Sequence, residues 1–248
     1  MPSFDARIEA VRRVLPVPLF ALFAPDLGME GVARAGRLRW TFAIALACSL
    51  LAGASAALRV DARDSTLFAL EKRGELKAMS DRQVEDAQKG NERTFEVSRL
   101  ALAAVEPPVS LALSLAGLLA LSWFLRGKPK ASPLFAVCGV GLLPGALADL
   151  LDAVAALRHE VVPPEALQHL SPRHLADFAA TVGHPLAGAA AKLGSAVDLY
   201  SLWGAVLLGY GLAASASLPV RRAVPAALIG WLLFRLLTHV AVPTSPGG

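Results

Sequence analysis

Five long apolar stretches constrain this chain more than any other feature of its sequence. Each holds 18 to 25 residues, and the stretches cover 41–58, 105–125, 133–157, 196–218 and 223–242. A helix of about 20 residues crosses the hydrocarbon core of a bilayer, which is about 30 Å thick. Lipid offers the backbone no hydrogen-bond partners, so such stretches must be helical. The sequence therefore predicts an all-α polytopic membrane protein with five transmembrane helices and short amphipathic or interfacial helices.

Composition supports a membrane protein and argues against nucleic acid as a partner. Of the 248 residues 55% are hydrophobic and 18% are charged, which is less charge than a soluble domain of this length carries. The net charge of +4 is small, and the basic residues cluster at the ends of the apolar stretches. Because basic and aromatic residues are not interleaved along the chain, we expect lipids rather than nucleic acid around the protein.

The apolar stretches divide the chain into three parts. We predict a cytoplasmic N-terminal segment at 1–39, a membrane domain at 40–242 and a flexible tail at 243–248. Apolar residues at helical spacing within 1–15 predict a short amphipathic helix, which either lies on the membrane or is an ordinary solvated helix. Pro16, Pro18 and Pro25 should interrupt the apolar patch that follows.

The two long connections are predicted to be extracytoplasmic loops, at 59–104 and 158–195. Residues 59–102 hold nine Lys/Arg and nine Asp/Glu, and oppositely charged pairs at helical spacing predict a charged helical hairpin. Ser80 stands where an N-cap is expected. This hairpin is either a solvated surface or a docking surface for a partner. In the second loop, Pro163-Pro164 and Ser171-Pro172 each predict the start of a short helix.

Glycines predict where the membrane helices pack most closely. Gly141 and Gly145 lie four residues apart in the third stretch, where Pro144 should kink the helix. Gly204 and Gly211 thin the fourth stretch in the same way. We expect these small-residue faces to contact another helix, including a helix of a partner protein.

The Lys/Arg distribution predicts the orientation of the chain. The short links that lack acidic residues carry Arg37, Arg39, Lys128, Arg221 and Arg222 near helix ends. Short basic links stay in the cytoplasm, whereas long charge-balanced loops weigh little in orientation. We therefore predict a multi-pass membrane protein with a cytoplasmic N-terminus.

Ionisable residues inside the apolar stretches are the strongest candidates for a functional or structural site. Glu106, Asp149, Asp198 and Arg235 all fall toward the predicted outer side, and such residues are costly in lipid unless they are paired. We expect Arg235 to pair with Asp149 or Asp198 and so tie three helices together. The cluster can be a buried structural lock, a proton or solute pathway, or a set of groups solvated at the interface.

Catalytic and cofactor motifs are absent from the sequence. His159, His169, His174 and His184 lie in or beside the second loop, but no two of them have metal-ligand spacing on one helix face. Phosphate-binding, dinucleotide-binding and nucleophile-elbow motifs are also missing. We therefore predict no catalytic, cofactor or metal site and no enzymatic activity. A zinc-dependent hydrolase on the outer loops is the competing hypothesis, and it predicts bound zinc.

The last two apolar stretches carry a family resemblance. The run 197–203 reads VDLYSLW, 206–214 reads VLLGYGLAA and 227–233 reads ALIGWLL. Together with Met79-Ser80-Asp81-Arg82, these runs resemble bacterial members of the Yip family, which are relatives of Golgi proteins that interact with Rab-type GTPases. Asp198, Tyr200 and Trp203 lie in the most specific part of the resemblance. The long acidic N-terminal region of the eukaryotic members is absent.

The resemblance implies a five-helix protein of the bacterial inner membrane that acts by binding other membrane components. Its most concrete form is an accessory subunit of an ABC exporter, whose extracytoplasmic part would contact residues 59–102. The alternative, drawn from the ionisable residues themselves, is a small transporter or channel that uses the Asp/Glu/Arg cluster.

Overall fold

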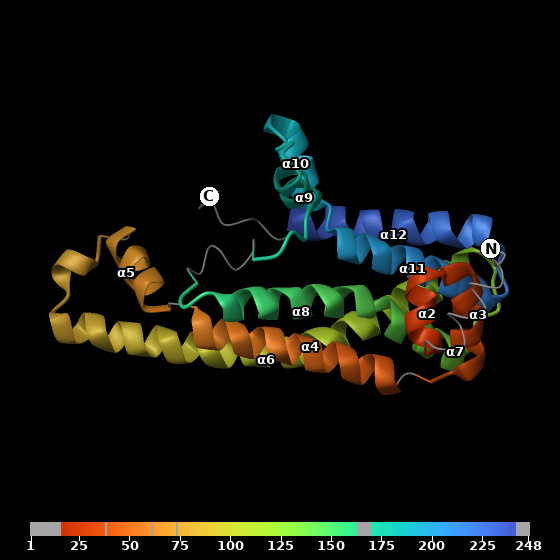
Figure 1. Cartoon of the computed structure of the whole chain (residues 1–248), viewed down its shortest axis with the longest axis horizontal. Coiled ribbons are helices and arrows are strands. Elements are labelled where there is room, and N and C mark those ends of the chain that lie inside the picture. The colour runs from red at the N-terminus through yellow and green to blue at the C-terminus, as the bar shows by residue number, and fades with distance from the viewer. Residues whose placement is uncertain (1–15, 38, 61, 73, 163–169, 242–248) are drawn as a thin grey trace, which may run out of the picture. The chain divides into compact units, whose positions relative to one another are not determined.

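The computed structural model describes residues 16–37, 39–60, 62–72, 74–162 and 170–241, and this part of the chain is helical (Figure 1). Within these ranges the β contacts are isolated bridges, such as the parallel bridge between Val60 and Val162. The predicted all-α class is therefore confirmed. The helices are α2 (Val17–Phe23), α3 (Pro25–Ala35), α4 (Arg39–Arg59), α5 (Ala62–Lys72), the 3₁₀ turn η1 (Leu76–Ala78), α6 (Asp81–Phe124), α7 (Ala131–Gly141), α8 (Leu143–Arg158), α9 (Leu175–Thr181), α10 (Gly188–Ala196), α11 (Leu199–Ala216) and α12 (Val220–Ala241).

Four helical segments of the described residues are long and apolar enough to cross a membrane. They are Arg39–Arg59, Asp81–Phe124, Ala131–Arg158, which joins α7 and α8, and Leu199–Ala216. These segments contain the first four predicted stretches nearly in full. The fifth stretch, 223–242, overlaps α12, which is 22 residues long but is not among the four. The count of five spans therefore stays a prediction.

The chain forms two compact units. Unit 1 comprises Met1–Ile44, Val109–Gly145 and Ala196–Gly248, and unit 2 comprises Ala45–Pro108 and Ala146–Ser195. The boundary falls inside α4, inside α6 and inside α8. In α6 it comes directly after Pro107 and Pro108, which cannot donate backbone hydrogen bonds to the preceding turn.

Unit 1 is built around α11. This helix packs against α12, α7 and α3, and α2 packs against α3 (Figure 1). The core consists of large apolar side chains together with small residues, and Leu134, Val137, Leu207 and Leu212 are completely buried in it. Burial of apolar side chains between helices stabilises a unit of this kind and leaves little space for polar groups.

Glycines set the closest helix contacts of unit 1. An ideal Cβ built on Gly211 of α11 would lie 2.0 Å from Val137 Cγ1 of α7, and one on Gly204 would lie 2.9 Å from the Gly141 carbonyl oxygen. A Cβ on Gly141 would in turn lie 2.6 Å from Leu208 Cδ2. These three glycines therefore pack against another helix of the same unit, as predicted, while binding of a partner protein to these faces stays a prediction. Gly145 has open space around its Cβ position.

Unit 2 brings together three helices that meet through small residues. A Cβ on Gly53 of α4 would lie 2.6 Å from the Ala103 Cβ and 3.1 Å from the Arg99 carbonyl oxygen of α6. Figure 1 shows α4, α6 and α8 running along one another in this region. The Val162 N–H donates to the Arg59 carbonyl oxygen at 2.7 Å and so connects the ends of α8 and α4.

The charged segment after α4 forms a helical hairpin, but half of it belongs to a much longer helix than predicted. Ser80 caps α6 as expected, with reciprocal hydrogen bonds between Ser80 and Gln83. From Asp81 the helix continues without interruption for 44 residues into the apolar stretch. On the hairpin, Arg63 of α5 pairs with Glu92 of α6 at 2.8 Å. The Asn91 side chain also donates to the Thr66 hydroxyl at 2.7 Å.

Prolines begin helices at several places where the sequence predicted an interruption. Pro18 lies in the first turn of α2, and Pro25 is the first residue of α3. Proline suits the first turn because its missing N–H has no helical partner there. Around Pro144 the predicted kink is a break, since α7 ends at Gly141 and α8 begins at Leu143.

Several predictions fall partly or wholly outside the described residues. The amphipathic helix within 1–15, the helix start at Pro163-Pro164 and the tail 243–248 lie there entirely.

The helix start predicted at Ser171-Pro172 lies within the described residues and is wrong, because α9 begins at Leu175 with His174 as its N-cap. The Asp177 carboxylate accepts a hydrogen bond from the His174 N–H at 3.2 Å.

Candidate functional site

The predicted cluster of ionisable residues is divided between two places in the structure. Glu106 and Asp149 belong to unit 2 and line a polar cavity. Asp198 and Arg235 belong to unit 1 and pair with each other. Sequence reasoning expected one lock joining three helices. The structure places two separate charge clusters.

The cavity in unit 2 has a volume of about 340 Å³. One face of each of α4, α6 and α8 lines the cavity, together with the segment before α9. Every lining residue belongs to unit 2. On each helix the lining residues recur three, four and seven positions apart, which is the spacing of one helix face. The lining residues are Ser49, Ala52, Gly53, Ser55, Ala56, Arg99, Leu102, Ala103, Glu106, Asp149, Asp152, Ala156, Leu170, Arg173 and His174.

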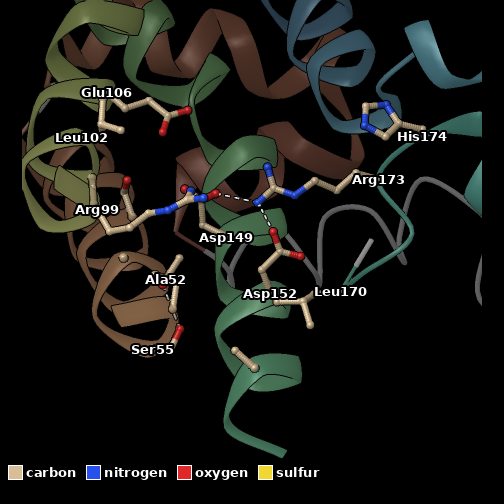
Figure 2. Close-up of a pocket in the computed structure, with 15 residues that line it drawn as sticks. Ala52, Ser55, Arg99, Leu102, Glu106, Asp149, Asp152, Leu170, Arg173 and His174 are labelled. Atoms are coloured by element: carbon tan, nitrogen blue, oxygen red, sulfur yellow. Dashed lines mark hydrogen bonds and ion pairs between the residues drawn. The ribbon is translucent and has the colours of Figure 1, made fainter. Parts of the chain in front are cut away.

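Arg173 holds two carboxylates of α8 in the cavity. Its Nη2 lies 2.7 Å from Asp149 Oδ1 and 2.6 Å from Asp152 Oδ2, and Figure 2 shows both interactions meeting at one nitrogen. The three side chains are 19 to 28% exposed. The Ser171 hydroxyl donates a further hydrogen bond to Asp152. A single guanidinium thus compensates two acids one helical turn apart.

The electrostatics of Arg173 keep it charged at physiological pH. Burial lowers the pKa of its guanidinium, but the Asp152 and Asp149 carboxylates raise it by more, so its pKa lies above the ordinary value. Arg173 Nε is buried and has no hydrogen-bond partner among the described residues, and the same holds for His174 Nδ1. Buried polar atoms without partners are costly, so these two atoms mark places where a bound molecule would be favoured.

Glu106 and Arg99 complete the charge lining from α6. In Figure 2 the Glu106 carboxylate points into the cavity, and the Arg99 side chain extends toward Asp149 from the side opposite Arg173. The Arg99 guanidinium also lies 5.1 Å from the centre of the Phe95 ring. Glu106 has no hydrogen bond or ion pair with a described residue. The cavity therefore presents three carboxylates, two guanidiniums and one imidazole.

The second charge cluster, in unit 1, is compact and largely satisfied. Arg235 Nη2 of α12 lies 3.1 Å from Asp198 Oδ2 and 3.0 Å from the Ser201 hydroxyl. Asp198 also caps α11, because its carboxylate accepts hydrogen bonds from the Tyr200 and Ser201 N–H groups. The Trp231 indole N–H donates to the Ser201 hydroxyl at 3.2 Å. This arrangement joins α11 to α12.

Sequence reasoning missed the residues that organise the cavity. Asp152 was visible as an ionisable residue of the third stretch. Arg99, Ser171 and Arg173 lie in segments that were interpreted as loops, and His174 was interpreted as one of several interfacial loop histidines. The signal that could have revealed the cavity is the shared spacing of polar and small residues on α4, α6 and α8. No group of three metal-binding side chains exists among the described residues.

Comparison with protein-family models, with curated proteins and with solved structures found no match to this chain. The resemblance to the Yip family therefore stays a prediction.

Proposed function

We propose that this protein is a non-enzymatic membrane protein that binds a small polar solute or a proton in the cavity of unit 2, in the manner of a small transporter or channel. The single observation that carries the proposal is the charged cavity itself. It lies among helices that are long and apolar enough to cross a bilayer, where uncompensated charge is expensive. Two features of the cavity support this choice over a structural lock.

The first feature is space. A structural ion pair needs no void beside it. The cavity of about 340 Å³ around Arg173 is large enough for a small solute or several waters.

The second feature is the lack of a partner for Glu106, which leaves one carboxylate for a proton or a ligand. Polar residues inside membrane helices commonly mark ion and solute pathways.

The proposal is tested by flux into liposomes that contain the purified protein. A pH-sensitive dye reports proton flux, and a radiolabelled panel of small cations, anions and neutral polar solutes reports solute flux. Glu106→Gln is the most informative variant, because Glu106 has no described ion pair whose loss would unfold the protein. We expect it to abolish flux while the thermal unfolding midpoint in detergent is unchanged. Asp149→Asn should also abolish flux.

Glu96→Gln is the matched control. Glu96 is an exposed acid of α6 that does not line the cavity, so its flux should equal that of the wild type. Wild-type liposomes that conduct no more than empty liposomes, for protons and for every solute of the panel, would refute the proposal. So would equal loss of flux in the Glu96 and Glu106 variants.

The second candidate function is an accessory subunit of a membrane complex, for which the ABC exporter is the concrete case. The observation that favours it is the charged hairpin of α5 and the first turns of α6. Its helices are fixed to each other by Arg63–Glu92 and by Asn91, while most of its charged side chains stay exposed. On the predicted orientation, with a cytoplasmic N-terminus in the bacterial inner membrane, this hairpin would face a partner's extracytoplasmic part.

Co-purification separates the two functions. The tagged protein is extracted in mild detergent from its native host, and co-purifying proteins are quantified by mass spectrometry. Stoichiometric subunits of an ABC transporter that are lost on charge reversal by Arg82→Glu with Arg93→Glu support the accessory role. A solitary protein that still conducts in liposomes supports the transporter.

A further inference from the structure

Three short links between helices lie next to one another at one end of unit 1. The link between α6 and α7 contacts the link between α11 and α12, since the Lys128 N–H donates to the Ala216 carbonyl oxygen at 3.2 Å. A Cβ on Gly127 would also lie 3.1 Å from a Leu218 methyl carbon. The link between α3 and α4 contacts the start of α7, because a Cβ on Gly36 would lie 2.7 Å from the Ser132 hydroxyl oxygen. The structure thus gathers three links that are far apart in the sequence.

This end of unit 1, which we call the basic rim, carries seven exposed basic side chains. They are Arg37, Arg39, Arg126, Lys128, Lys130, Arg221 and Arg222. The described residues of 36–41, 123–132 and 214–224 include no acid. None of the seven forms an ion pair with a described residue. Such a one-sided set of charges repels itself, so a surface of this kind is stabilised by an anion.

Exposed aromatic side chains border the basic rim. Trp40 is 77% exposed, Trp123 is 83% exposed and Phe124 is 77% exposed. Trp40 follows Arg39 at the start of α4, and the other two end α6 just before Arg126. Tryptophan next to basic residues at the ends of apolar helices is typical of the boundary between headgroups and acyl chains. The anion that covers the rim is thus expected to come from a lipid.

The rim also contains a hollow of the right chemistry. A cavity of about 520 Å³ is lined by Gly36, Arg37, Arg39 and Trp40. Gly36 ends α3 in the left-handed conformation, with φ of 58°, which turns the chain sharply into α4. Two guanidiniums beside an indole ring can bind phosphate oxygens while the ring packs on the glycerol and upper acyl chain.

We infer that the basic rim is a binding site for the phosphate headgroup of an anionic phospholipid, with Arg37 and Arg39 as its principal phosphate ligands. The three exposed aromatic residues lie at the ends of α4 and α6, which are long and apolar enough to cross a membrane, and this position favours a lipid headgroup over a nucleic acid or an acidic protein. This site lies wholly in unit 1 and does not depend on the proposed transport function. It also agrees with the predicted cytoplasmic side, where anionic lipids give the membrane a negative surface potential.

The test measures lipid bound to the full-length protein. Purified wild-type protein is reconstituted in nanodiscs of phosphatidylcholine with or without cardiolipin, extracted again in mild detergent and analysed by native mass spectrometry. We expect cardiolipin to be retained in preference to phosphatidylcholine. Arg37→Gln with Arg39→Gln should lower the retained cardiolipin on the order of tenfold, since each basic residue near an anionic surface contributes several-fold in affinity. Sodium chloride should weaken retention, because it screens exposed charges.

Arg82→Gln with Arg93→Gln is the matched control. It removes the same charge from exposed positions of α6 in unit 2 and should leave retention unchanged. If the Arg37/Arg39 double variant unfolds at a lower temperature in phosphatidylcholine alone, Lys128→Gln with Lys130→Gln replaces it, with the same expected direction. Wild-type retention in the rim variants, or equal losses in the rim and control variants, would overturn the inference. Inorganic phosphate that displaces all the cardiolipin at equal concentration would also overturn it, because the site would then be one for a free anion.

Discussion

Units 1 and 2 both contain parts of helices that are long and apolar enough to cross a membrane, yet they enclose very different interiors. In unit 1, large apolar residues such as Leu134, Leu207 and Leu212 fill the space between α7 and α11. In unit 2, the buried residues of α4, α6 and α8 are mostly alanine and serine, for example Ala56, Ala103 and Ala153. Small residues bring helices together at a few points but cannot fill the space between them. The comparison teaches that an apolar stretch can encode either a closed core or the wall of a cavity.

The charged residues of the two units also differ in how completely they are hydrogen-bonded. In unit 1 the Asp198–Arg235 pair completes its hydrogen bonding with Tyr200, Ser201 and the cap of α11. In unit 2 one guanidinium is shared by two carboxylates, and Arg173 Nε is left without a described partner. An ion pair whose hydrogen bonds are all made within the protein indicates a structural role. A charge cluster beside a cavity, with hydrogen-bonding groups left over, indicates a binding site. Five substitutions test this difference between the units, and they are given in decreasing order of expected effect.

Arg173→Leu should have the largest effect on stability. It removes the guanidinium that pairs with both Asp149 and Asp152 in a mostly buried site, which costs about 3–5 kcal/mol. The measurement is the unfolding free energy in mild detergent or in SDS titration. The triple variant Arg173→Leu, Asp149→Leu, Asp152→Leu should recover most of the loss, because it removes the charges together. If the triple variant is less stable than the single one, packing and not charge is the cause.

Arg235→Leu should destabilise the protein by about 3 kcal/mol or impair its insertion. The expected loss is smaller because Asp198 keeps the two backbone hydrogen bonds of its cap. Expression in the membrane fraction and the thermal unfolding midpoint measure the effect. Unchanged values for both would show that the pair is solvated and not structural. Liposome flux per folded molecule should stay at the wild-type level, which Arg173→Leu would not allow.

Gly211→Ala should cost about 2 kcal/mol, since its Cβ would overlap Val137 in the closed core of unit 1. Gly145→Ala is the matched control, because its Cβ would meet open space in α8 and should be neutral or slightly stabilising. Thermal unfolding of both proteins provides the comparison. Equal midpoints would contradict the close contact of α7 and α11.

Ser171→Ala should cost about 1 kcal/mol, through loss of one hydrogen bond to Asp152. Asp152 keeps its ion pair with Arg173 in this variant. The cavity should therefore persist, and flux should fall by less than in Asp149→Asn. Ser171→Thr retains the hydroxyl and serves as the control. A Ser171→Ala loss as large as that of Arg173→Leu would mean that the serine, and not the guanidinium, holds the cluster.

Lys89→Gln should have no measurable effect on the unfolding midpoint. Lys89 pairs with Glu85 at 2.6 Å in the charged part of α6 that precedes its apolar stretch. Both side chains are exposed there, so solvent screens the interaction. Circular dichroism during thermal unfolding checks this. A clear drop would show that the hairpin surface contributes to folding and would weaken its role as a docking surface.

The sequence predicted the helical class, the positions of four apolar segments and the local caps. Apolar stretches and caps depend on neighbouring residues, so Ser80 and Asp198 were recognisable from the sequence alone. The partner of Asp149 was not recognisable. Arg173 lies 24 residues away in the chain and comes next to α8 only after the following segment folds back. The length of α6 was missed because the charged hairpin and the second apolar stretch were predicted as separate helices, whereas α6 runs through both without interruption.

The Asp198–Arg235 pair also has a consequence for how the chain enters the membrane. Arg235 lies in α12, which overlaps the predicted fifth span, and an isolated arginine in a membrane helix raises the insertion free energy by up to about 2.5–3.5 kcal/mol. Its carboxylate partner lies on the preceding helix, and the two helices are joined by a tight turn at Ser217, whose φ is 54°. We therefore expect α11 and α12 to leave the translocon as one hairpin, already neutralised, so that the C-terminal helix depends on its neighbour for biogenesis.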